Sequence, residues 1–380
     1  MTGTFFITGA TGNIGGKLVA RILKADKSPR LILLVRADSS AGAQQRLSRV
    51  LRTLSPDLDL SAAKEKITLV CGDITRPRMG LTETDWTRLA SEVTHVVHSA
   101  AATKFFLPVE TAREVNLEGT RNVMDFAFQA ANKGKLERIA HISTAYVCGN
   151  EDGMIYEDDT LPARTFTNNY ESSKWQAECL VRRIMPELPV MIFRPSIVAG
   201  DSLTGRILSF NGLYTPLKFI HRGAVDVLPG IPDALLDVVP LDYASDAIHY
   251  IFAGSDDGLG KTFHIVAGKD KSARVDAIVA RAVRYFRESS PARTIPPIRF
   301  VRPCNNGEAN QSAGMKAGRI SSILRQFEPY LTAKKIFDDV NTAHALQGSG
   351  ISAPGLFSYF RTILAYSLET DWGRQIKDAA

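Results

Sequence analysis

The chain has 380 residues, 44% of them hydrophobic and 23% charged, which is typical of a soluble globular protein with one large domain or two modest ones. The net charge of +6 suits anionic small molecules, and the absence of a known nucleic-acid motif argues against a nucleic-acid partner. No apolar run approaches the ~20 residues of a membrane span, and four scattered cysteines lack metal-binding spacing, so we expect no membrane segment, no metal and a cytoplasmic location.

Strand-like and helix-like segments alternate through the first half of the chain. Short apolar runs, each long enough for one strand, occupy residues 4–8, 31–35, 67–71, 93–97, 138–142 and 189–193. Helical patterns fill the intervals at 13–25, 39–54, 83–91, 109–132 and 169–185. This alternation predicts an α/β fold with a doubly wound parallel sheet of the Rossmann type, covered by helices on both faces.

The alternation breaks after Pro195, where residues 200–235 are rich in glycine, proline and leucine. We expect a short run at 236–240, a helix at 241–254 and a strand at 261–266 to rejoin the sheet. From residue 267 onward helical patterns dominate. We therefore predict a larger Rossmann domain of residues 1–200 and 236–266, and a smaller, substrate-binding part of residues 201–235 and 267–380.

A glycine-rich turn follows the first strand. Gly9, Gly12 and Gly15 are spaced for a tight turn, a close backbone approach to a pyrophosphate and close packing of the next helix on the strand. The start of that helix supplies unpaired N–H groups for an anion. Because the motif stands between a strand and a helix, it predicts dinucleotide binding rather than a structural turn. The predicted binding residues of this segment are Thr8, Gly9, Thr11, Gly12, Asn13, Ile14 and Gly15.

The end of the second predicted strand bears on the choice of dinucleotide. NAD-selective folds usually place an acid there, whereas this chain has Arg36, and Arg46 follows in the next helix. A guanidinium matches a 2′-phosphate, so NADPH is favoured, although solvated arginines and the nearby Asp38 keep NAD open. The remaining predicted cofactor residues follow later strands, with Asp73 beside the adenine: Asp73, Ile74, Ala100, Ala101, Pro195, Ser196 and Ile197.

Tyr170 and Lys174 stand four residues apart in the helical segment 169–185. This spacing places both side chains on one helical face, one turn apart. The lysine could lower the pKa of the phenol and let it act as an acid, or the two could form an ordinary solvated pair. The pair alone does not decide between these interpretations.

Several motifs together resemble the extended short-chain dehydrogenase/reductase family. They are TGATGNIG at the start, HSAAAT at 98–103, NLEGT at 116–120, HISTAYVCG, and the pair Tyr170 and Lys174, in the family's order over the first two-thirds of the chain. The resemblance implies that Tyr170 is the proton donor and that Lys174 binds the nicotinamide ribose and lowers the tyrosine pKa. A hydroxyl residue would bind the substrate oxygen, and Thr144 matches that position better than Ser143.

A narrower set of segments resembles the thioester-reductase branch, which includes fatty acyl-CoA reductases and terminal reductase domains of peptide synthetases. These segments are LVRADSSAGAQQRL, GDITRPRMGL, HSAAATKFF, SSKWQAECLV, FRPSIVAGDSLTG, LLDVVPLDYASDAI and FEPYLTAKKIFDDVNTAHAL. The resemblance implies NADPH-dependent reduction of an acyl thioester to an aldehyde, in some members onward to an alcohol.

Two departures from that branch bear on the substrate. The chain shows neither an adenylation nor a carrier domain, so we expect the acyl donor, acyl-CoA or an acyl carrier protein, to arrive as a separate molecule. Lys104, Phe105 and Phe106 replace the smaller residues expected after HSAA, which predicts a different substrate pocket.

Other functions remain open on the same scaffold. They are a sugar-nucleotide epimerase or dehydratase, a hydroxysteroid-type alcohol dehydrogenase, and a non-catalytic NADPH sensor, which would not need Tyr170 and Lys174. Seven arginines between residues 274 and 302 also allow two interpretations. They form either a solvated helical face, which we prefer, or a landing patch for CoA phosphates or an acidic carrier protein.

Overall fold

Seven parallel strands form the main sheet of the computed structural model, in the order β12-β7-β5-β4-β1-β2-β3. The structure describes residues 3–25, 29–105, 107–159, 162, 164–254, 256–302 and 319–378. The predicted α/β doubly wound parallel sheet is confirmed. Its strands are β1 (Thr4–Thr8), β2 (Arg30–Val35), β3 (Ile67–Cys71), β4 (His95–His98), β5 (Arg138–Ile142), β7 (Val190–Pro195) and β12 (Thr262–Ile265).

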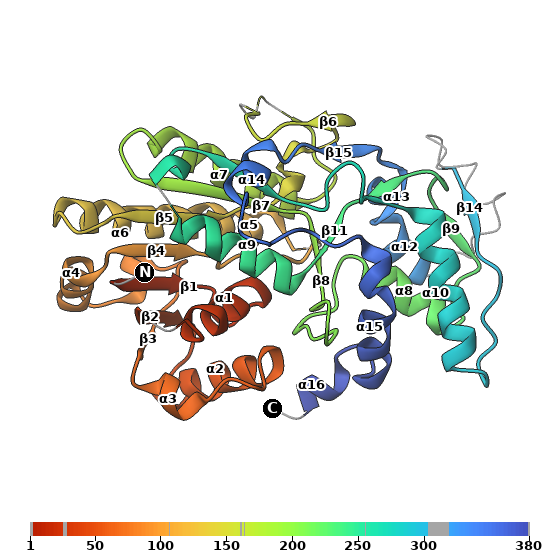
Figure 1. Cartoon of the computed structure of the whole chain (residues 1–380), viewed down its shortest axis with the longest axis horizontal. Coiled ribbons are helices and arrows are strands. Elements are labelled where there is room, and N and C mark those ends of the chain that lie inside the picture. The colour runs from red at the N-terminus through yellow and green to blue at the C-terminus, as the bar shows by residue number, and fades with distance from the viewer. Residues whose placement is uncertain are drawn as a thin grey trace.

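Helices cover both faces of this sheet, which explains why its strands are almost continuously apolar. The β1 residues Phe5, Phe6 and Ile7 have no exposed surface. One apolar layer joins the sheet to α1 (Asn13–Leu23), α2 (Ser40–Leu54) and α9 (Leu241–Ala253). The layer on the other face joins it to α4 (Glu83–Glu92), α6 (Gly119–Asn132) and α7 (Asn169–Ile184) (Figure 1).

The segment after β7 differs in part from the prediction. β12 joins the edge of the main sheet beside β7, as expected for 261–266. The run at 236–240 does not join it, because β11 (Val238–Pro240) pairs with β8 (Ile197–Ala199) and β10 (Leu235–Leu236) pairs with β13 (Ala273–Arg274). Pro240 is the last residue of β11 and has no backbone N–H to donate. A proline therefore suits a short pairing at an edge better than a position inside a sheet.

A third apolar cluster holds the rest of the chain together, at the right of Figure 1. It is built mainly by α8 (Tyr214–His221), α10 (Val275–Ser289), α12 (Arg319–Arg325), α13 (Glu328–Thr332) and α15 (Leu356–Glu369). The strand β15 (Lys335–Phe337) pairs with β6 (Gly153–Ile155) and so ties this part to the segment after β5. The division of the chain into a cofactor domain and a substrate part stays a prediction.

The remaining short elements connect these layers. The predicted helix at 109–132 is observed as α5 (Val109–Arg113), a π-helical turn η2 (Glu114–Glu118) and α6 in succession. The others are α3 (Leu60–Lys64), η1 (Pro77–Gly80), η3 (Ala145–Cys148), η4 (Asp256–Gly258), β9 (Val227–Pro229), β14 (Arg299–Val301), α14 (Val340–Ala345) and α16 (Arg374–Asp378). Across the described ranges, no helix is long and apolar enough to cross a membrane.

Candidate active site

The turn between β1 and α1 has the geometry that its glycines predict. Gly9 has φ +75, and a Cβ atom there would lie 2.5 Å from the backbone nitrogen of Ala100. A Cβ atom on Gly15 would lie 2.2 Å from the carbonyl oxygen of Gly9, so larger residues would force α1 away from the strand. The N–H of Gly12 donates to the Gly9 carbonyl at 2.9 Å, which closes the turn in front of α1.

One cleft, with about 720 Å³ of empty space, lies over the carboxyl ends of β1, β2 and β3. Among the described residues its lining includes ten of the predicted cofactor residues: Thr8, Gly9, Thr11, Gly12, Arg36, Arg46, Asp73, Ile74, Ala100 and Ala101. The lining also includes four residues that the sequence did not single out: Leu34, Gly72, Ser99 and Val115. Leu34, Gly72 and Ser99 lie at or just beyond the ends of strands, and Val115 lies on the helical segment after β4. The fold, rather than a sequence motif, therefore places these residues in the cleft.

The two predicted arginines come together at this cleft. A guanidinium nitrogen of Arg46 donates to the carbonyl oxygen of Arg36 at 2.9 Å, and the Arg36 guanidinium lies 4.0 Å from the Asp73 carboxylate. Burial lowers the pKa of Arg46, and the charge of Arg36 lowers it further. Asp38 is exposed and absent from the lining. A site with two neighbouring guanidinium groups fits a phosphate.

A second pocket, with about 1190 Å³ of empty space, continues from this cleft through Gly12, Ser99 and Ala101. It brings together all three predicted catalytic residues and most of the other predicted cofactor residues: Asn13, Ile14, Thr144, Tyr170, Lys174, Pro195, Ser196 and Ile197. Of the predicted site residues, Gly15 lines neither space and packs beneath the turn. The two spaces form one extended site whose glycine cradle and arginines fit a dinucleotide.

Tyr170 and Lys174 lie on the first turns of α7, whose N-cap residue Asn168 accepts a hydrogen bond from the N–H of Glu171 at 2.9 Å. The ammonium of Lys174 donates to the carbonyl oxygen of Ile142, at the end of β5, at 2.8 Å. Only 2% of the Lys174 side chain is exposed, and this burial lowers its pKa to about 8. The two residues are therefore not a solvated surface pair.

The electrostatics of Tyr170 differ from the prediction. Desolvation raises its pKa to about 12, and a hydrogen bond with Thr144 offsets this only in part. The lowering predicted from Lys174 is not observed, because the groups that shift this pKa, apart from burial, are Thr144 and the charge of Glu171. At neutral pH the phenol is therefore fully protonated, as a proton donor must be.

The structure distinguishes Thr144 from Ser143. Ser143 also lines the pocket, but its hydroxyl donates to the Glu178 carboxylate at 2.5 Å, so its proton is already used. The Thr144 hydroxyl contacts Tyr170 and caps the short helix η3, where it accepts from the N–H of Tyr146 at 3.3 Å. This geometry leaves Thr144 as the hydroxyl beside the proposed acid.

A residue that the sequence did not assign, Asn116, holds the loop after β4 against α7. Its side-chain amide exchanges two hydrogen bonds with the backbone of Ala102, at 2.8 and 3.1 Å, and donates to Ser173 at 2.8 Å. Asn116 lies in the π-helical turn η2, which directs the amide into the protein interior. The loop that it fixes carries Thr103 and Phe105 into the pocket. Phe106 lies outside the described residues.

A second unassigned feature is the loop after β8, which covers the start of α1. The Asn13 side chain donates to the Ser209 hydroxyl at 3.0 Å and accepts from the N–H of Leu208 at 2.9 Å. An ion pair of 2.7 Å between Lys17 and Asp201 fixes the other end of the loop. Asn13 therefore joins the glycine turn to the loop after β8, which lines the pocket through Ser209.

Comparison with known proteins places the chain in a family. Residues 7–248 match an NAD-binding family model described as male sterility protein. The chain belongs to this family. The resemblance to the thioester-reductase branch of extended short-chain dehydrogenases/reductases is therefore confirmed. The same matches confirm that the chain is an oxidoreductase with an NAD(P)-binding domain.

Three similar proteins represent the range of relatives. The chain is 30% identical to aldehyde reductase lnbA of Aspergillus flavus, over 87% of this chain and 34% of that protein. It is 24% identical to probable fatty acyl-CoA reductase 5 of Arabidopsis thaliana, over 89% and 88%. The terminal R domain from the myxalamid PKS-NRPS pathway superposes with a TM-score of 0.80 at 27% identity, covering 97% of this chain and 91% of that one. The chain spans about a third of the length of several curated relatives that it matches.

Proposed function

We propose that this chain reduces an acyl thioester to an aldehyde with NADPH. The observation that carries the proposal is the meeting of Tyr170, Lys174 and Thr144 in one pocket that continues into a glycine-cradled dinucleotide cleft. The named functions of the relatives support it, since an aldehyde reductase, a fatty acyl-CoA reductase and a terminal reductase domain are among them.

The residues divide the chemistry between them. NADPH, when bound, supplies the hydride that adds to the thioester carbonyl carbon. Thr144 donates a hydrogen bond that orients the carbonyl oxygen, and Tyr170 transfers its proton to the developing oxyanion. Lys174, fixed by the Ile142 carbonyl, holds its ammonium beside the ribose site and favours the tyrosinate that proton transfer leaves. The resulting hemithioacetal loses its C–S bond and separates into aldehyde and thiol.

Two further parts of the proposal concern the cofactor and the acyl donor. Arg36 and Arg46 favour NADPH over NADH, because together they match the 2′-phosphate that NADH lacks. The donor is acyl-CoA or a carrier-bound thioester, since the similar proteins include a fatty acyl-CoA reductase and a terminal domain of a PKS-NRPS pathway. The similarity to an aldehyde reductase supports a second reduction, from aldehyde to alcohol.

A substrate panel tests the proposal. Acyl-CoAs, free aldehydes and alcohols are each offered with NADPH or NADH, and the nicotinamide absorbance is followed. We expect oxidation of NADPH with acyl-CoAs and release of one thiol per aldehyde formed. Turnover of secondary alcohols, without any turnover of thioesters, would favour the alcohol dehydrogenase alternative. Sugar nucleotides are tested separately by product analysis, since an epimerase or dehydratase causes no net change in nicotinamide absorbance, and their conversion would favour that alternative.

A further inference from the structure

A third space, which we call the α2 cleft, lies between α2 and the C-terminal helices α15 and α16. Its volume is about 900 Å³, in the upper part of the range of ordinary small-molecule sites, about 300–1,000 Å³. Figure 1 shows the loop after β8 between α2 and α15, and this loop contributes Arg206 to the lining. None of the three predicted catalytic residues lines the α2 cleft, so it is a candidate for a separate binding function.

Four arginines line the α2 cleft, and they come from two segments that are distant in sequence. Arg46, Arg49 and Arg52 follow one another at three-residue intervals on α2, which places neighbouring members on one face of the helix. Arg206 comes from the loop after β8, and its guanidinium donates to the Thr53 carbonyl oxygen at 3.2 Å. The four guanidinium groups border one space, an arrangement that suits several phosphate oxygens at once.

The positive charge of the α2 cleft is not balanced by acidic side chains. Within the described part of the chain, no Asp or Glu lines it. Arg46 and Arg206 donate to the carbonyl oxygens of Arg36 and Thr53, which position the guanidinium groups without cancelling their charge. Burial lowers the pKa of Arg46, and the charges of Arg36 and Arg49 lower it further. A cleft lined by charge of one sign attracts a ligand of the opposite sign.

The α2 cleft also has a surface that suits a purine base. Tyr366 of α15 and Ile376 of α16 line it, together with the amide side chains Gln45 and Gln375. The Tyr366 ring lies 6.0 Å from the Arg206 guanidinium, so the aromatic wall adjoins the phosphate-binding groups. An aromatic ring, an apolar side chain and amides match the face and the edges of a base. The lining therefore fits a phosphorylated nucleotide better than an inorganic anion.

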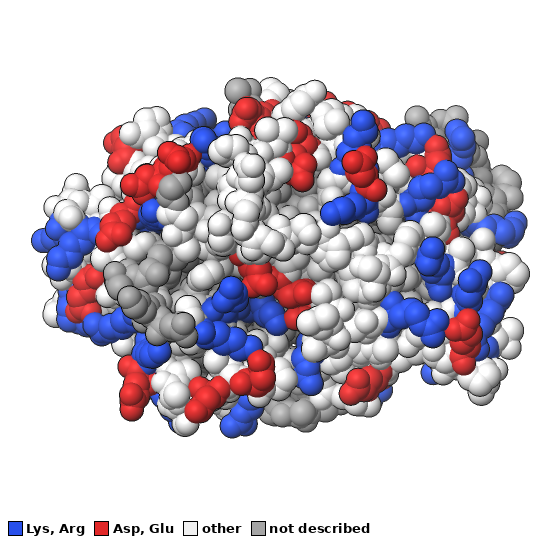
Figure 2. Space-filling view, viewed as in Figure 1, with Lys and Arg blue, Asp and Glu red and all other residues white. Residues whose placement is uncertain are grey.

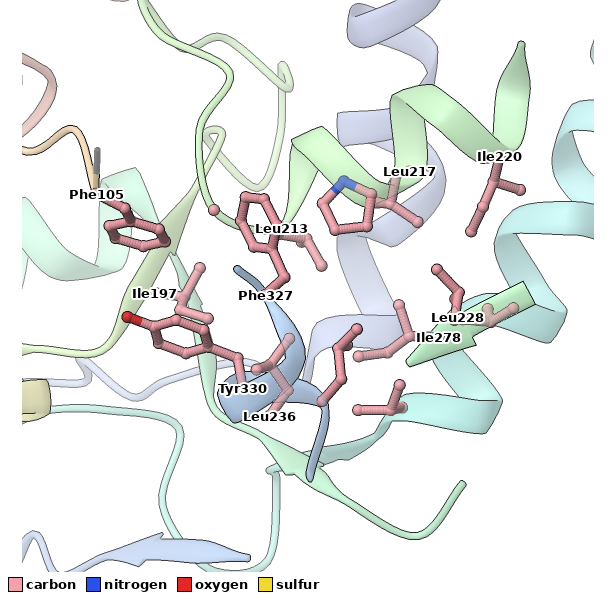
Figure 3. Close-up of a pocket in the computed structure, with 15 residues that line it drawn as sticks. Phe105, Ile197, Leu213, Leu217, Ile220, Leu228, Leu236, Ile278, Phe327 and Tyr330 are labelled. Carbon is pink, nitrogen blue, oxygen red and sulfur yellow. The ribbon is translucent and has the colours of Figure 1, made fainter. Parts of the chain in front are cut away.

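The catalytic pocket has no comparable place for the phosphates of a thiol donor. Its glycine turn is assigned to the dinucleotide, and among its described lining residues the only cation is Lys174, which is bonded to the Ile142 carbonyl. Phe105, Ile197 and Tyr330, which lie together in Figure 3, give the pocket a largely apolar wall. A donor that carries phosphates must therefore place them outside the pocket that reduces its thioester.

The loop after β8 borders both spaces. Arg206 lines the α2 cleft, and Ser209, three residues further on, lines the catalytic pocket together with Asn211 and Gly212. Three extended residues span at most about 11 Å. The pantetheine arm of coenzyme A is longer than this, so it is long enough to pass from one space into the other.

From these observations we infer that the α2 cleft binds the 3′-phosphoadenosine diphosphate group of coenzyme A, so that the acyl donor is acyl-CoA. This inference rests on the proposed function. The 3′-phosphate and the diphosphate contact the four arginines, the adenine lies toward Tyr366, and the pantetheine arm passes Ser209 into the catalytic pocket. The thiol released when the C–S bond breaks is then free coenzyme A. The phosphopantetheine of a carrier protein has one phosphate and no adenosine, so it satisfies only part of this site.

A series of donors that differ only in the group beyond the thioester tests this site. The best acyl group of the substrate panel is offered on CoA, dephospho-CoA, phosphopantetheine and N-acetylcysteamine, at saturating NADPH. We expect KM to rise with each group removed, at least about tenfold for the 3′-phosphate, the loss typical of a hydrogen bond to a charged group. The value of kcat should change little, because the reacting atoms are the same. Equal KM values for acyl-CoA and acyl-phosphopantetheine would overturn the inference.

A matched pair of double variants locates the site. Arg49→Ala with Arg52→Ala should raise KM for acyl-CoA at least about tenfold and leave KM for the N-acetylcysteamine thioester unchanged. Arg281→Ala with Arg284→Ala removes the same charge from α10 and should alter neither KM. All four side chains are exposed, and thermal unfolding checks that both variants fold. Equal losses with the two thioesters, or a rise in KM for acyl-CoA only in the α10 variant, would contradict the assignment.

A binding measurement separates this inference from the proposed function. Free CoA is titrated calorimetrically into the enzyme saturated with NADP⁺, which keeps CoA out of the cleft over β1, β2 and β3. CoA should bind, and Arg49→Ala with Arg52→Ala should weaken its binding at least about tenfold while the α10 variant does not. No binding of CoA, or binding that the α2 variant leaves unchanged, would overturn the site. A failure to reduce any thioester would instead overturn the proposed function, while the CoA titration still decides the site.

Discussion

Removal of a single oxygen atom tests the role of Tyr170. Tyr170→Phe should lower kcat at least about 10²–10⁴-fold, because the oxyanion loses its proton donor. NADPH affinity should stay near wild type, since Tyr170 lines the pocket with Thr144 and Lys174 and does not line the cleft that holds Arg36 and Arg46. Tyr156→Phe makes the same change at an exposed position and should have no effect. Near-normal turnover of Tyr170→Phe would show that another group supplies the proton.

The buried ammonium of Lys174 predicts an upper pH limit for activity. Burial lowers its pKa to about 8. Above that pH the lysine loses the charge that favours the tyrosinate, so kcat/KM should fall about tenfold per pH unit as the pH rises beyond 8. Initial rates across pH 6–10, with the fold checked at each pH, measure this limb. A profile that stays level up to pH 10 would contradict the prediction.

Arg36 is the residue on which the choice of NADPH most depends. Arg36→Ala should weaken NADPH binding by about 1.5–3 kcal/mol, the typical loss for a hydrogen bond to a charged group, and NADH binding far less. Arg30→Ala removes the same side chain from the opposite end of β2, where Arg30 pairs with Glu92 at 2.9 Å, and serves as the control. Equal losses for both cofactors in binding titrations would contradict the NADPH proposal.

Single residues were predictable where a motif constrains them. The glycines, Arg36, Tyr170 and Lys174 stand at fixed positions relative to strands and helices, so the sequence was enough to bring them to one site. Tyr330 was not predictable, because it reaches the pocket from α13, 160 residues beyond Tyr170 in the chain. Phe105 drew attention only as an unusual residue, and its packing between Tyr170 and Tyr330 needed the structure.

At the level of elements, one buried ion pair fixes the catalytic helix. Glu178 of α7 contacts Arg194 of β7 at 2.6 Å, and the two side chains are 0% and 1% exposed. Burial would raise the pKa of Glu178, but the charges of Arg194 and Arg182, together with hydrogen bonds from Arg194 and Ser143, outweigh it and hold the pKa at about 2. The folded-state pKa is therefore depressed, and this contribution to stability is present above the unfolded pKa of ~4.3. It is lost as the pH falls toward 2.

Glu178→Gln should therefore destabilise the protein strongly. It leaves the Arg194 guanidinium buried without its counter-charge, which costs about 3–5 kcal/mol when one partner of such a pair is removed. The melting temperature should fall clearly at pH 7, and the difference from wild type should narrow as the pH approaches 3. Glu187→Gln changes the same group at an exposed position just after α7 and should shift stability by less than about 0.5 kcal/mol. Similar melting temperatures for both variants would argue against this role for the ion pair.

The elements themselves were predictable to different degrees. The strands of the main sheet follow from apolar runs of the right length, and α1, α2 and α7 follow from their helical spacing. The short pairings of β8, β10 and β11 were not predictable, because two or three apolar residues do not specify a partner strand. The loop between β8 and α8 is fixed by side chains distant in sequence, such as the Lys17–Asp201 and Asn13–Ser209 contacts.

At the scale of the whole molecule, the contacts of the arginines between 274 and 302 favour one of the two interpretations of this segment. Of the arginines between 274 and 302, Arg274 pairs with Asp276, Arg281 lies over the Phe357 ring at 4.2 Å, Arg287 donates to the Ile295 carbonyl, and Arg299 lies 3.8 Å from Asp226. Figure 2 shows basic side chains over the α10 side with acidic side chains among them. These contacts support the interpretation of this segment as a solvated helical face.

A second basic surface lies between α2 and the C-terminal helices α15 and α16. An open cleft between α2 and the C-terminal helices is lined by four arginines and, among its described lining residues, by no acid: Arg46, Arg49, Arg52 and Arg206. Arg46 also lines the cleft over the carboxyl ends of β1, β2 and β3, so the two spaces adjoin. Clefts lined by charge of one sign raise the local concentration of ligands of the opposite sign. NADPH, a polyanion, should therefore be attracted to its site through this field.

Charge reversal at two positions tests this long-range attraction. The double variant Arg49→Glu and Arg52→Glu should slow NADPH association and weaken its binding at low ionic strength, because the arginine field is inverted beside the site. The effect should largely disappear in 1 M salt, where the screening length falls to about 3 Å. Arg281→Glu with Arg284→Glu makes the same change in net charge on α10 and should leave NADPH binding unaltered. Stopped-flow association rates at several salt concentrations measure both variants. If the two pairs slowed association equally, net charge rather than the cleft would control the rate.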